Sequence, residues 1–395
     1  MEKKTIEDLD VLNKKVLVRV DFNVPLKNGV ISDDTRIKEA LPTINYLLNK
    51  GAAVILMSHL GRPDGKPVPE FSLKPVYERV CELMPNRKVY FSSDVVGENA
   101  KNLAKNLKSG EVLLLENLRY DAGEEENDKD FAEKLAALGD IYVNDAFGTA
   151  HRKHASTYGV AKLLPNAIGF LIEKELKMIC GNIDNPKRPF VAILGGAKVA
   201  DKLGLINTLI DKADTVVVGG GMAFTFLKAM GKNIGNSLVD DEQLEMCKQA
   251  LEKAKQKGVE VLLPVDVVVA SDINAKDGEY LKEIDVPKGK MGLDIGKKTI
   301  KLFAKTIKKA KTIVWNGPMG VFENPVFATG TYKVAKAVAK SHAISIVGGG
   351  DSASAITHMG FEKKITHIST GGGASMKLLE GKVLPAVDII ENRIG

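Results

Sequence analysis

The chain has 395 residues, a length that favours two or more domains, and its 44% hydrophobic and 27% charged residues exclude a disordered or fibrous polypeptide. The formal net charge of +6 is spread along the chain rather than gathered into a polybasic run, so we expect neither nucleic acid nor a membrane surface as a partner. The apolar runs are far shorter than the ~18 residues of a membrane span, and no signal-peptide core follows the N-terminal methionine. We therefore expect a cytoplasmic protein.

Cysteine and arginine usage narrows the chemistry. The three cysteines, Cys81, Cys180 and Cys247, are widely separated, so the chain offers neither a disulfide framework nor a paired-cysteine metal site. Only nine of the 56 basic residues are arginine, and seven of these nine precede residue 160. Because arginine binds carboxylates and phosphates through paired hydrogen bonds, this distribution indicates anion recognition in the first half of the chain.

Short β-branched runs alternate with amphipathic stretches throughout, a pattern typical of a parallel sheet covered by helices. In the first half, we expect strands near Lys15–Asp21, Ala53–Ser58, Lys88–Phe91, Val112–Glu116 and Ile141–Asp145, and helices near Thr35–Asn49, Leu73–Met84, Glu98–Leu107 and Asp128–Leu138. The acidic stretch Asp121–Asp130 is short enough to be a solvated loop and the start of a helix.

The second half repeats the scheme. Its expected strands lie near Phe190–Leu194, Thr215–Val218, Glu260–Leu263, Val265–Ala270, Thr312–Trp315, Ala343–Val347 and Thr366–Ser369. Its expected helices lie near Ala200–Lys212, Ala223–Met230, Glu242–Lys257, Lys297–Lys309, Thr331–Lys340, Ser352–Met359 and Ala374–Leu379.

The predicted fold class is α/β, with two doubly wound, Rossmann-like parallel-sheet domains joined by a hinge helix. The expected bounds are 1–168 for the N-terminal domain, 169–189 for the joining helix and linker, 190–380 for the C-terminal domain and 381–395 for a tail. A helix that joins two lobes is typical of hinge motion.

Ligands of open α/β sheets bind beyond the carboxyl ends of the strands, so the residues after each strand are informative. In the first half these residues include arginine, histidine, aspartate and asparagine, which together suit a small anion carrying phosphate and carboxylate groups. They are Asp21-Phe22-Asn23, His59-Leu60-Gly61-Arg62, Arg119, Asp145 and His151-Arg152, with Arg36 at the start of the first helix.

The strand ends of the second half carry glycine instead. Glycine lets the backbone approach a ligand closely, and a glycine turn that leads into a helix presents amide groups to phosphate. Five such turns in one sheet predict a nucleotide cleft. The turns are Gly195-Gly196, Gly219-Gly220-Gly221, Gly317-Pro318, Gly348-Gly349-Gly350 and Gly371-Gly372-Gly373.

The residues alone are compatible with more than one kind of nucleotide cleft. No Walker motif is present, and Gly348-x-Gly350-x-x-Ala353 fits the fingerprint of dinucleotide-binding dehydrogenases. Asp351 lies inside that turn and would repel a pyrophosphate unless Mg²⁺ lay between them. The chain shows no obvious nucleophile arrangement, and phosphoryl transfer needs mainly positioning and charge stabilisation, so the residues favour a kinase.

Two other classes remain open on the residues. A dehydrogenase needs an acid about 20 residues after its fingerprint to bind ribose, but the sequence there is Gly371-Gly-Gly-Ala. A non-catalytic anion-binding protein would not need Lys198, Asp351 and glycine turns in addition to the arginines. Asp201, Asp266 and Asp294 are expected to be helix caps or structural partners, and Trp315 a packing residue.

The strand-end motifs, taken as a set and in order, closely resemble those of the 3-phosphoglycerate kinase family over essentially the whole chain. The motifs are Val18-Arg-Val-Asp-Phe-Asn-Val-Pro25, Ser58-His-Leu-Gly-Arg-Pro63, Asn144-Asp-Ala-Phe-Gly-Thr-Ala-His-Arg152, Leu194-Gly-Gly-Ala-Lys-Val199, Trp315-Asn-Gly-Pro-Met-Gly320, Gly348–Ser352 and Ser369-Thr-Gly-Gly-Gly-Ala374.

The resemblance implies reversible, Mg²⁺-dependent phosphoryl transfer between 1,3-bisphosphoglycerate and ADP, in a monomer whose tail packs on the N-terminal domain. It implies roles in transfer for Arg36, Lys198, Gly372 and Gly373. It implies phosphoglycerate binding by Asp21, Phe22, Asn23, Arg36, His59, Leu60, Gly61, Arg62, Arg119 and Arg152. It implies nucleotide binding by Gly196, Lys202, Gly220, Gly292, Leu293, Asn316, Pro318, Glu323, Gly349, Gly350, Asp351 and Ser352, with Asp351 also holding the metal.

Overall fold

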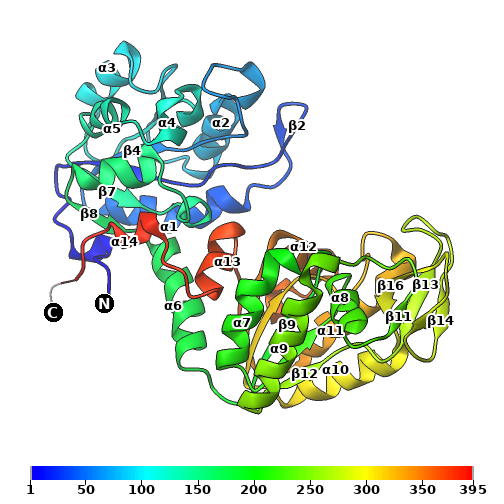
Figure 1. Ribbon diagram of the computed structural model, residues 1–395. Coiled ribbons are helices and arrows are strands. Elements are labelled where there is room, and N and C mark those ends of the chain that lie inside the picture. Colours follow the sequence, from blue (N-terminus) through cyan, green and yellow to red (C-terminus); the bar gives the residue numbers. More distant parts are fainter. Residues whose placement is uncertain (1, 394–395) are drawn as a thin grey trace. The chain divides into compact units, whose positions relative to one another are not determined.

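The structure is a computed structural model that describes residues 2–393 (Figure 1). The chain divides into two compact units. The N-terminal unit contains the residues up to Leu176 together with the segment that begins at Val383, and the C-terminal unit is Lys177–Lys382. The last two residues of the predicted tail lie outside the described residues. Two parallel sheets with helices confirm the predicted α/β class.

The N-terminal unit is built on a six-stranded parallel sheet. Its order is β5 (Val89–Phe91), β6 (Val112–Leu114), β4 (Ala53–Met57), β1 (Lys15–Arg19), β7 (Ile141–Asn144) and β8 (Asn166–Ile168). All five residues of β4 are buried, as expected of a central parallel strand that is covered on both faces. Because all the strands run the same way, their carboxyl ends lie at one edge of the sheet.

Helices and one hairpin complete this unit. The helices are α1 (Thr35–Asn49), α2 (Lys74–Leu83), α3 (Glu98–Asn106), α4 (Gly123–Glu126), α5 (Lys129–Ala136), α6 (Phe170–Asp184) and α14 (Pro385–Asp388), and the hairpin pairs β2 (Leu26–Lys27) with β3 (Val30–Ile31). Asp128 caps α5 by accepting a hydrogen bond from the Phe131 amide at 2.8 Å. The division between the units falls within α6.

The segment from Val383 onward is hydrogen-bonded into the N-terminal unit, and Figure 1 shows α14, in red, beside the first elements of the chain. The Asn144 side-chain amide donates to the Ala386 carbonyl at 2.9 Å, and the Lys4 amide donates to the Glu391 carbonyl at 2.8 Å. Arg393 forms an ion pair with Asp8 at 2.8 Å. The two ends of the chain therefore build one unit.

One expectation for this unit is half confirmed: a helix does start within Asp121–Asp130, at Lys129. The acidic stretch Asp121–Asp130 is not simply a solvated loop, because it contains α4, and Glu124 within α4 is fully buried. The reason is internal pairing: the Ser156 amide donates to Glu124 Oε2 at 2.9 Å and the Ser156 hydroxyl donates to Oε1 at 2.6 Å.

The C-terminal unit has a second six-stranded parallel sheet. Its order is β12 (Glu260–Leu262), β10 (Thr215–Val218), β9 (Phe190–Leu194), β17 (Thr312–Asn316), β18 (Ile344–Gly348) and β19 (His367–Ile368). Its helices are α7 (Leu203–Lys212), α8 (Met222–Ala229), α9 (Leu244–Lys257), α10 (Lys297–Lys309), α11 (Thr329–Lys340), α12 (Gly350–His358) and α13 (Gly373–Leu379). Trp315, predicted as a packing residue, is fully buried.

The predicted strand Val265–Ala270 does not join this sheet. As β13 (Val267–Ala270) it pairs antiparallel with β14 (Glu279–Leu281) and β16 (Met291–Ile295) in a separate sheet. A further short pair joins β11 (Asn233–Ile234) and β15 (Asp285–Val286). None of these partner strands is predicted from the sequence, because they are short and lie within glycine-, lysine- and aspartate-rich text.

Two of the three predicted structural aspartates are helix caps. Asp266 accepts hydrogen bonds from the amides of Lys298 and Thr299 at the start of α10, at 2.7 and 2.8 Å. Asp294 accepts from the Gly330 amide in the first turn of α11 at 2.7 Å. No helix among residues 2–393 has the length and apolar character needed to cross a membrane.

Candidate active site

In the N-terminal unit, the carboxyl ends of β1 and β4 are tied together by polar side chains. Arg36 Nη1 donates to both carboxylate oxygens of Asp21, at 3.0 and 3.1 Å, and to the Asn23 carbonyl at 3.2 Å. The Asn23 side-chain oxygen accepts a hydrogen bond from the Gly61 amide at 3.0 Å. Asp21, Asn23, Arg36 and Gly61, predicted separately from three motifs, therefore lie in one cluster.

His59 lies at the end of β4 among four arginines. Burial and then the positive charges of Arg19, Arg119, Arg36 and Arg152 hold the pKa of His59 well below its usual value. An imidazole so surrounded is neutral at pH 7. Four guanidinium groups whose charges all act on this buried ring make the strand edge attractive to an anion.

Arg119 is almost fully buried, which is unusual for an arginine. Its Nη1 donates to the Gly61 carbonyl at 2.8 Å and its Nη2 is 2.9 Å from the Glu125 carboxylate. Its Nε is also buried and has no hydrogen-bond partner among residues 2–393. An oxygen of a bound anion would satisfy this donor.

The other predicted phosphoglycerate residues have different surroundings. Arg152 is half-buried, and its Nε is 3.3 Å from His151 Nε2. Arg62 is exposed. Phe22 and Leu60 are buried, and their amides donate to Ser58 Oγ and to the Asn117 side-chain oxygen. These two residues brace the strand ends, and their contact with a ligand stays a prediction.

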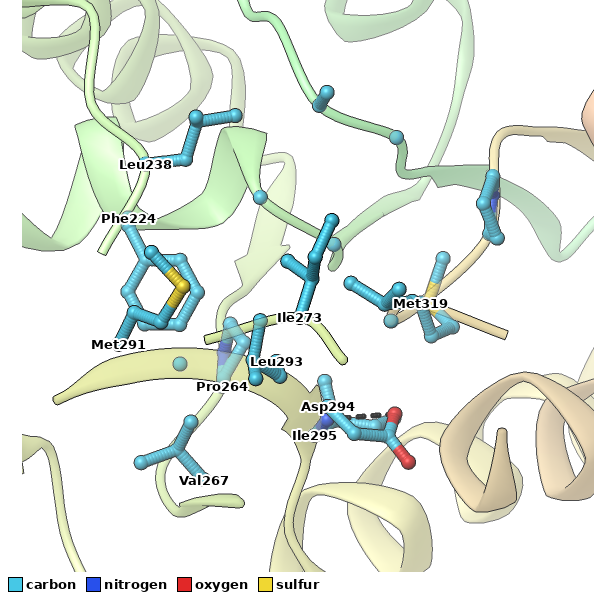
Figure 2. Close-up of a pocket in the computed structure, with 18 of the residues that line it drawn as sticks. Phe224, Leu238, Pro264, Val267, Ile273, Met291, Leu293, Asp294, Ile295 and Met319 are labelled. Carbon is cyan, nitrogen blue, oxygen red and sulfur yellow. Dashed lines mark hydrogen bonds between the residues drawn. The ribbon is translucent and has the colours of Figure 1, made fainter. Parts of the chain in front are cut away.

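In the C-terminal unit, a cavity of about 340 Å³ opens beside the carboxyl ends of the strands. Its walls are mostly apolar, and Figure 2 shows Phe224, Met291, Leu293 and Met319 around it. A cavity of this volume with apolar walls and few polar groups suits the base of a nucleotide. The predicted residues that line it are Gly196, Gly220, Gly292, Leu293, Pro318, Glu323 and Asp351.

The remaining predicted nucleotide residues form the turns next to this cavity. Lys202 Nζ donates to the carbonyls of Gly195 and Asn316, at 2.5 and 3.3 Å. The Gly317 amide donates to Ser352 Oγ at 2.5 Å, and the Asn316 side chain donates to the Gly348 carbonyl at 2.8 Å. Lys198 is exposed, and Gly372 and Gly373 lie at the start of α13.

The glycines of these turns serve two different purposes. A Cβ on Gly195 would lie 2.1 Å from the Pro318 carbonyl oxygen, and one on Gly220 would lie 2.6 Å from the Gly196 nitrogen, so these residues are glycine because neighbouring turns touch. A Cβ on Gly350 or Gly372 would meet no atom within 4 Å. Only the latter pair leaves open space for a ligand at the start of a helix.

Lys202 gives a pH-dependent prediction. Burial lowers its pKa to about 8, although Asp351 and Asp201 oppose the effect. Because nucleotide phosphates would raise this pKa again, we expect ADP binding at pH 8.5 to take up a fraction of a proton and to weaken as the pH rises above 8. Calorimetry in two buffers of different ionisation enthalpy measures the uptake. The proton uptake should vanish in Lys202→Met. It should persist in the control variant Lys228→Met, because the ion pair of Lys228 with Asp241 is exposed. Unchanged uptake in Lys202→Met would contradict the assignment of Lys202 to the phosphate site.

Several cavity residues are missed by sequence reasoning, namely Phe224, Leu238, Met291 and Met319. Apolar side chains carry no chemical signature, and Met291 belongs to a sheet that the sequence does not reveal. One signal was available in the sequence, namely Gly292. An isolated glycine within a strand indicates that a ligand or another part of the chain approaches the backbone closely at that point. A Cβ on Gly292 would lie 1.9 Å from the Phe224 ring.

Gly292→Ala is therefore expected to displace Phe224 into the cavity. Overpacking of this kind costs about 1–3 kcal/mol, so the Kd for ADP should rise about 5- to 100-fold. Gly181→Ala is the matched control, because a Cβ at Gly181 in α6 meets nothing within 4 Å. That control should bind ADP normally. Equal Kd values for the two variants, measured by calorimetry, would show that this cavity does not hold the nucleotide.

Asp351 is the residue to test for Mg²⁺. It is exposed in the first turn of α12, close enough to Lys202 to affect its pKa. No group of three or more His, Cys, Asp or Glu side chains within residues 2–393 could hold a metal by itself. A single exposed carboxylate near Lys202 and the glycine turns fits magnesium, which binds through one or two carboxylates, phosphate oxygens and water.

Comparison with known proteins identifies the family of the chain. The family model described as phosphoglycerate kinase matches residues 6–382. The chain is 54% identical to the phosphoglycerate kinases of Finegoldia magna and Thermosipho africanus, covering 100% of this chain in both cases and 100% and 99% of those relatives. The solved structure of phosphoglycerate kinase from Coxiella burnetii is similar to this structure with a TM-score of 0.90 at 42% sequence identity. The solved structure from Pyrococcus horikoshii gives a TM-score of 0.79 at 36% identity. Each of these matches covers 98% of both chains. The chain belongs to the phosphoglycerate kinase family.

Proposed function

We propose that the protein catalyses reversible, Mg²⁺-dependent phosphoryl transfer between 1,3-bisphosphoglycerate and ADP, giving 3-phosphoglycerate and ATP in glycolysis and its reverse. The observation that carries the proposal is the four arginines around His59 at the edge of the N-terminal sheet, in a chain of this family. A dehydrogenase would need an acid about 20 residues after the glycine fingerprint, where this chain has Gly371, and a passive anion-binding protein would not need the cavity of the C-terminal unit.

The N-terminal unit is proposed to bind phosphoglycerate. The spare donors of Arg119 and Arg36 support this role, as do Arg152, Arg62 and the neutral ring of His59, because a phosphate and a carboxylate together offer at least five oxygens to such donors. Asp21 and Asn23 orient Arg36. The tight packing of Phe22 and Leu60 keeps the strand ends in place.

The C-terminal unit is proposed to bind ADP or ATP. The base would lie against Gly292 and Leu293, Glu323 would accept hydrogen bonds from ribose, and Lys202 and the open turn at Gly350 would bind the phosphates. Mg²⁺ would bind Asp351 and neutralise phosphate charge. The remaining predicted nucleotide contacts are Gly196, Gly220, Asn316, Pro318, Gly349 and Ser352.

The reaction needs no base and no covalent intermediate. An oxygen of the ADP β-phosphate forms a bond to phosphorus while the bond from that phosphorus to the acyl oxygen breaks, and the electron pair stays on the departing carboxylate. Arg36, Lys198 and the amides of Gly372 and Gly373 are proposed to stabilise charge on the transferring group. The direct transfer requires both ligands to be bound at bonding distance from each other.

A coupled assay with 3-phosphoglycerate, ATP and Mg²⁺ tests the proposal, and we expect turnover that stops when EDTA removes the metal. Pure, folded protein without turnover would refute it. We also propose that the enzyme is a monomer in the cytoplasm, where glycolytic intermediates are found. Size-exclusion chromatography with light scattering tests the oligomeric state.

A further inference from the structure

Arg19 is a buried arginine whose chemistry the reaction described above does not use. It is the last residue of β1, in the middle of the N-terminal sheet, and it is 0% exposed. Its Nη1 donates to the Val20 carbonyl at 2.5 Å, its Nε donates to Ser156 Oγ at 2.8 Å, and its Nη2 lies 3.1 Å from His59 Nδ1. All three nitrogens of the guanidinium group are therefore held by the protein, and the side chain is fixed in one orientation.

A buried charge needs a partner, and Glu124 provides it through Ser156. The Ser156 hydroxyl accepts a hydrogen bond from Arg19 and donates its own proton to Glu124 Oε1 at 2.6 Å. Glu124 is itself fully buried, and burial raises its pKa, although the positive charge of Arg19 opposes this effect. Glu124 and Ser156 thus hold the guanidinium group of Arg19 in place through two consecutive hydrogen bonds.

The contact between Arg19 and His59 determines where the proton of the ring lies. A guanidinium group has only donors, so His59 Nδ1 must accept and cannot carry a proton. A neutral imidazole carries one proton, which must then be on Nε2. The charges that face His59, from Arg19, Arg36, Arg119 and Arg152, all oppose a second proton.

We propose that Arg19, held by Ser156 and Glu124, is a positioning residue that keeps His59 in its neutral Nε2–H tautomer, so that His59 donates a hydrogen bond to an oxygen of the anionic substrate. The role of His59 in substrate binding rests on the proposed function. The tautomer itself does not, because it follows from contacts within the ligand-free protein.

The advantage lies in charge balance at the substrate site. A protonated His59 would lie among four guanidinium groups, and mutual repulsion would loosen all of them. A ring without a proton on Nε2 would point a lone pair at an anion. The neutral Nε2–H form is the only state of the ring that attracts the substrate without adding to the repulsion.

The first test is the nitrogen NMR spectrum of the ligand-free protein labelled with ¹⁵N at its six histidines, with His59→Ala to assign the signal. We expect His59 to show an unprotonated Nδ1 and a protonated Nε2 from pH 6 to pH 8. An imidazolium or an Nδ1–H form at pH 7 would overturn the proposal even if the enzyme is active. Conversely, an inactive protein with the expected tautomer would refute the function and leave the positioning intact.

The second test separates positioning from direct binding or mere stability by a double-mutant cycle. Arg19→Lys keeps the charge but cannot hold Ser156 and His59 together. Loss of a hydrogen bond to a charged group weakens binding about 10- to 100-fold. We therefore expect kcat/KM for 3-phosphoglycerate to fall by this factor in Arg19→Lys, and we expect KM for ATP to stay constant. In the His59→Ala background, the same substitution should change kcat/KM less than about threefold.

Equal losses in both backgrounds would mean that Arg19 acts independently of His59, and the proposal would fail. Should Arg19→Lys not fold, Ser156→Ala takes its place, because it leaves Arg19 present but removes the acceptor of its Nε. We expect a smaller loss for Ser156→Ala, again confined to 3-phosphoglycerate and again absent when His59 is alanine. A mixture of the two His59 tautomers should accompany it in the NMR spectrum.

Discussion

Replacing Arg36 with alanine should lower kcat about 10²- to 10³-fold, the usual effect of removing one fixed donor from a developing charge, and should change the Kd for ATP less than twofold. Among residues 2–393, Arg36 makes hydrogen bonds through Nη1, to Asp21 and Asn23. The opposite side of its guanidinium group is therefore presented for a ligand in a fixed orientation. Steady-state kinetics and calorimetry with ATP measure the two quantities separately.

Arg79→Ala is the matched control for this experiment. Arg79 lies in the same unit, its side chain is 34% exposed against 36% for Arg36, and it also pairs with an aspartate, Asp34. Its loss should leave kcat within about twofold of the original value. A comparable decrease of ATP affinity in Arg36→Ala would show that Arg36 belongs to the nucleotide site and is misassigned.

Asp145→Asn should remove a large pH dependence of stability. Asp145 is fully buried at the end of β7, and burial raises its pKa to about 7. Its Oδ1 accepts hydrogen bonds from the amides of Leu171 and Ile172 in the first turn of α6, at 2.9 and 3.2 Å. Asparagine keeps an oxygen that can accept these bonds but has no charge to bury.

The sign follows from proton binding. Between its unfolded pKa near 4 and its folded pKa near 7, Asp145 binds a proton only in the folded state. The free energy of unfolding therefore falls as the pH rises through this range, by about 3 kcal/mol between pH 5 and pH 8. In Asp145→Asn, the free energy of unfolding should not decrease in this way. At pH 8 the variant should therefore be more stable than the original protein.

Urea unfolding followed by far-UV circular dichroism at the two pH values measures this effect. Trp315, the only tryptophan of the chain, lies in the other unit, so its fluorescence reports a transition that Asp145 does not directly influence. Asp128→Asn, an exposed cap of α5, is the matched control and should behave like the original protein at both pH values. A parallel pH dependence in Asp145→Asn and the original protein would contradict the prediction.

The parallel sheets could be predicted because their signals are local. Strands such as Ala53–Met57 are unbroken apolar runs that end in polar or glycine-rich text, and the same edge of each sheet then collects the predicted residues. The caps that Asp266 and Asp294 provide are not local, because each bonds to the start of a helix more than 30 residues further along the chain.

What the sequence could not reveal depends on partners that are distant along the chain. Glu124 reads as a surface acid among other acids, and only the approach of Ser156 and Arg19 explains its burial. Arg19 offered a weak signal, since an arginine in an otherwise apolar central strand requires an internal partner. For Gly195 and Gly220, the expected reason was ligand approach, whereas the structure shows contact between neighbouring turns.

The return of the C-terminal segment to the N-terminal unit determines when that unit can be completed during synthesis. Asn144 and Lys4 bond to residues beyond Val383, so the first unit lacks these partners until the whole C-terminal unit has been translated. At roughly 5–20 residues per second, the ribosome needs on the order of 10–40 s for the intervening Lys177–Lys382. The C-terminal unit is continuous in the chain, whereas the unit synthesised earlier waits for its partners beyond Val383. The unit that is synthesised first is therefore the one that cannot be completed until the other unit has been translated.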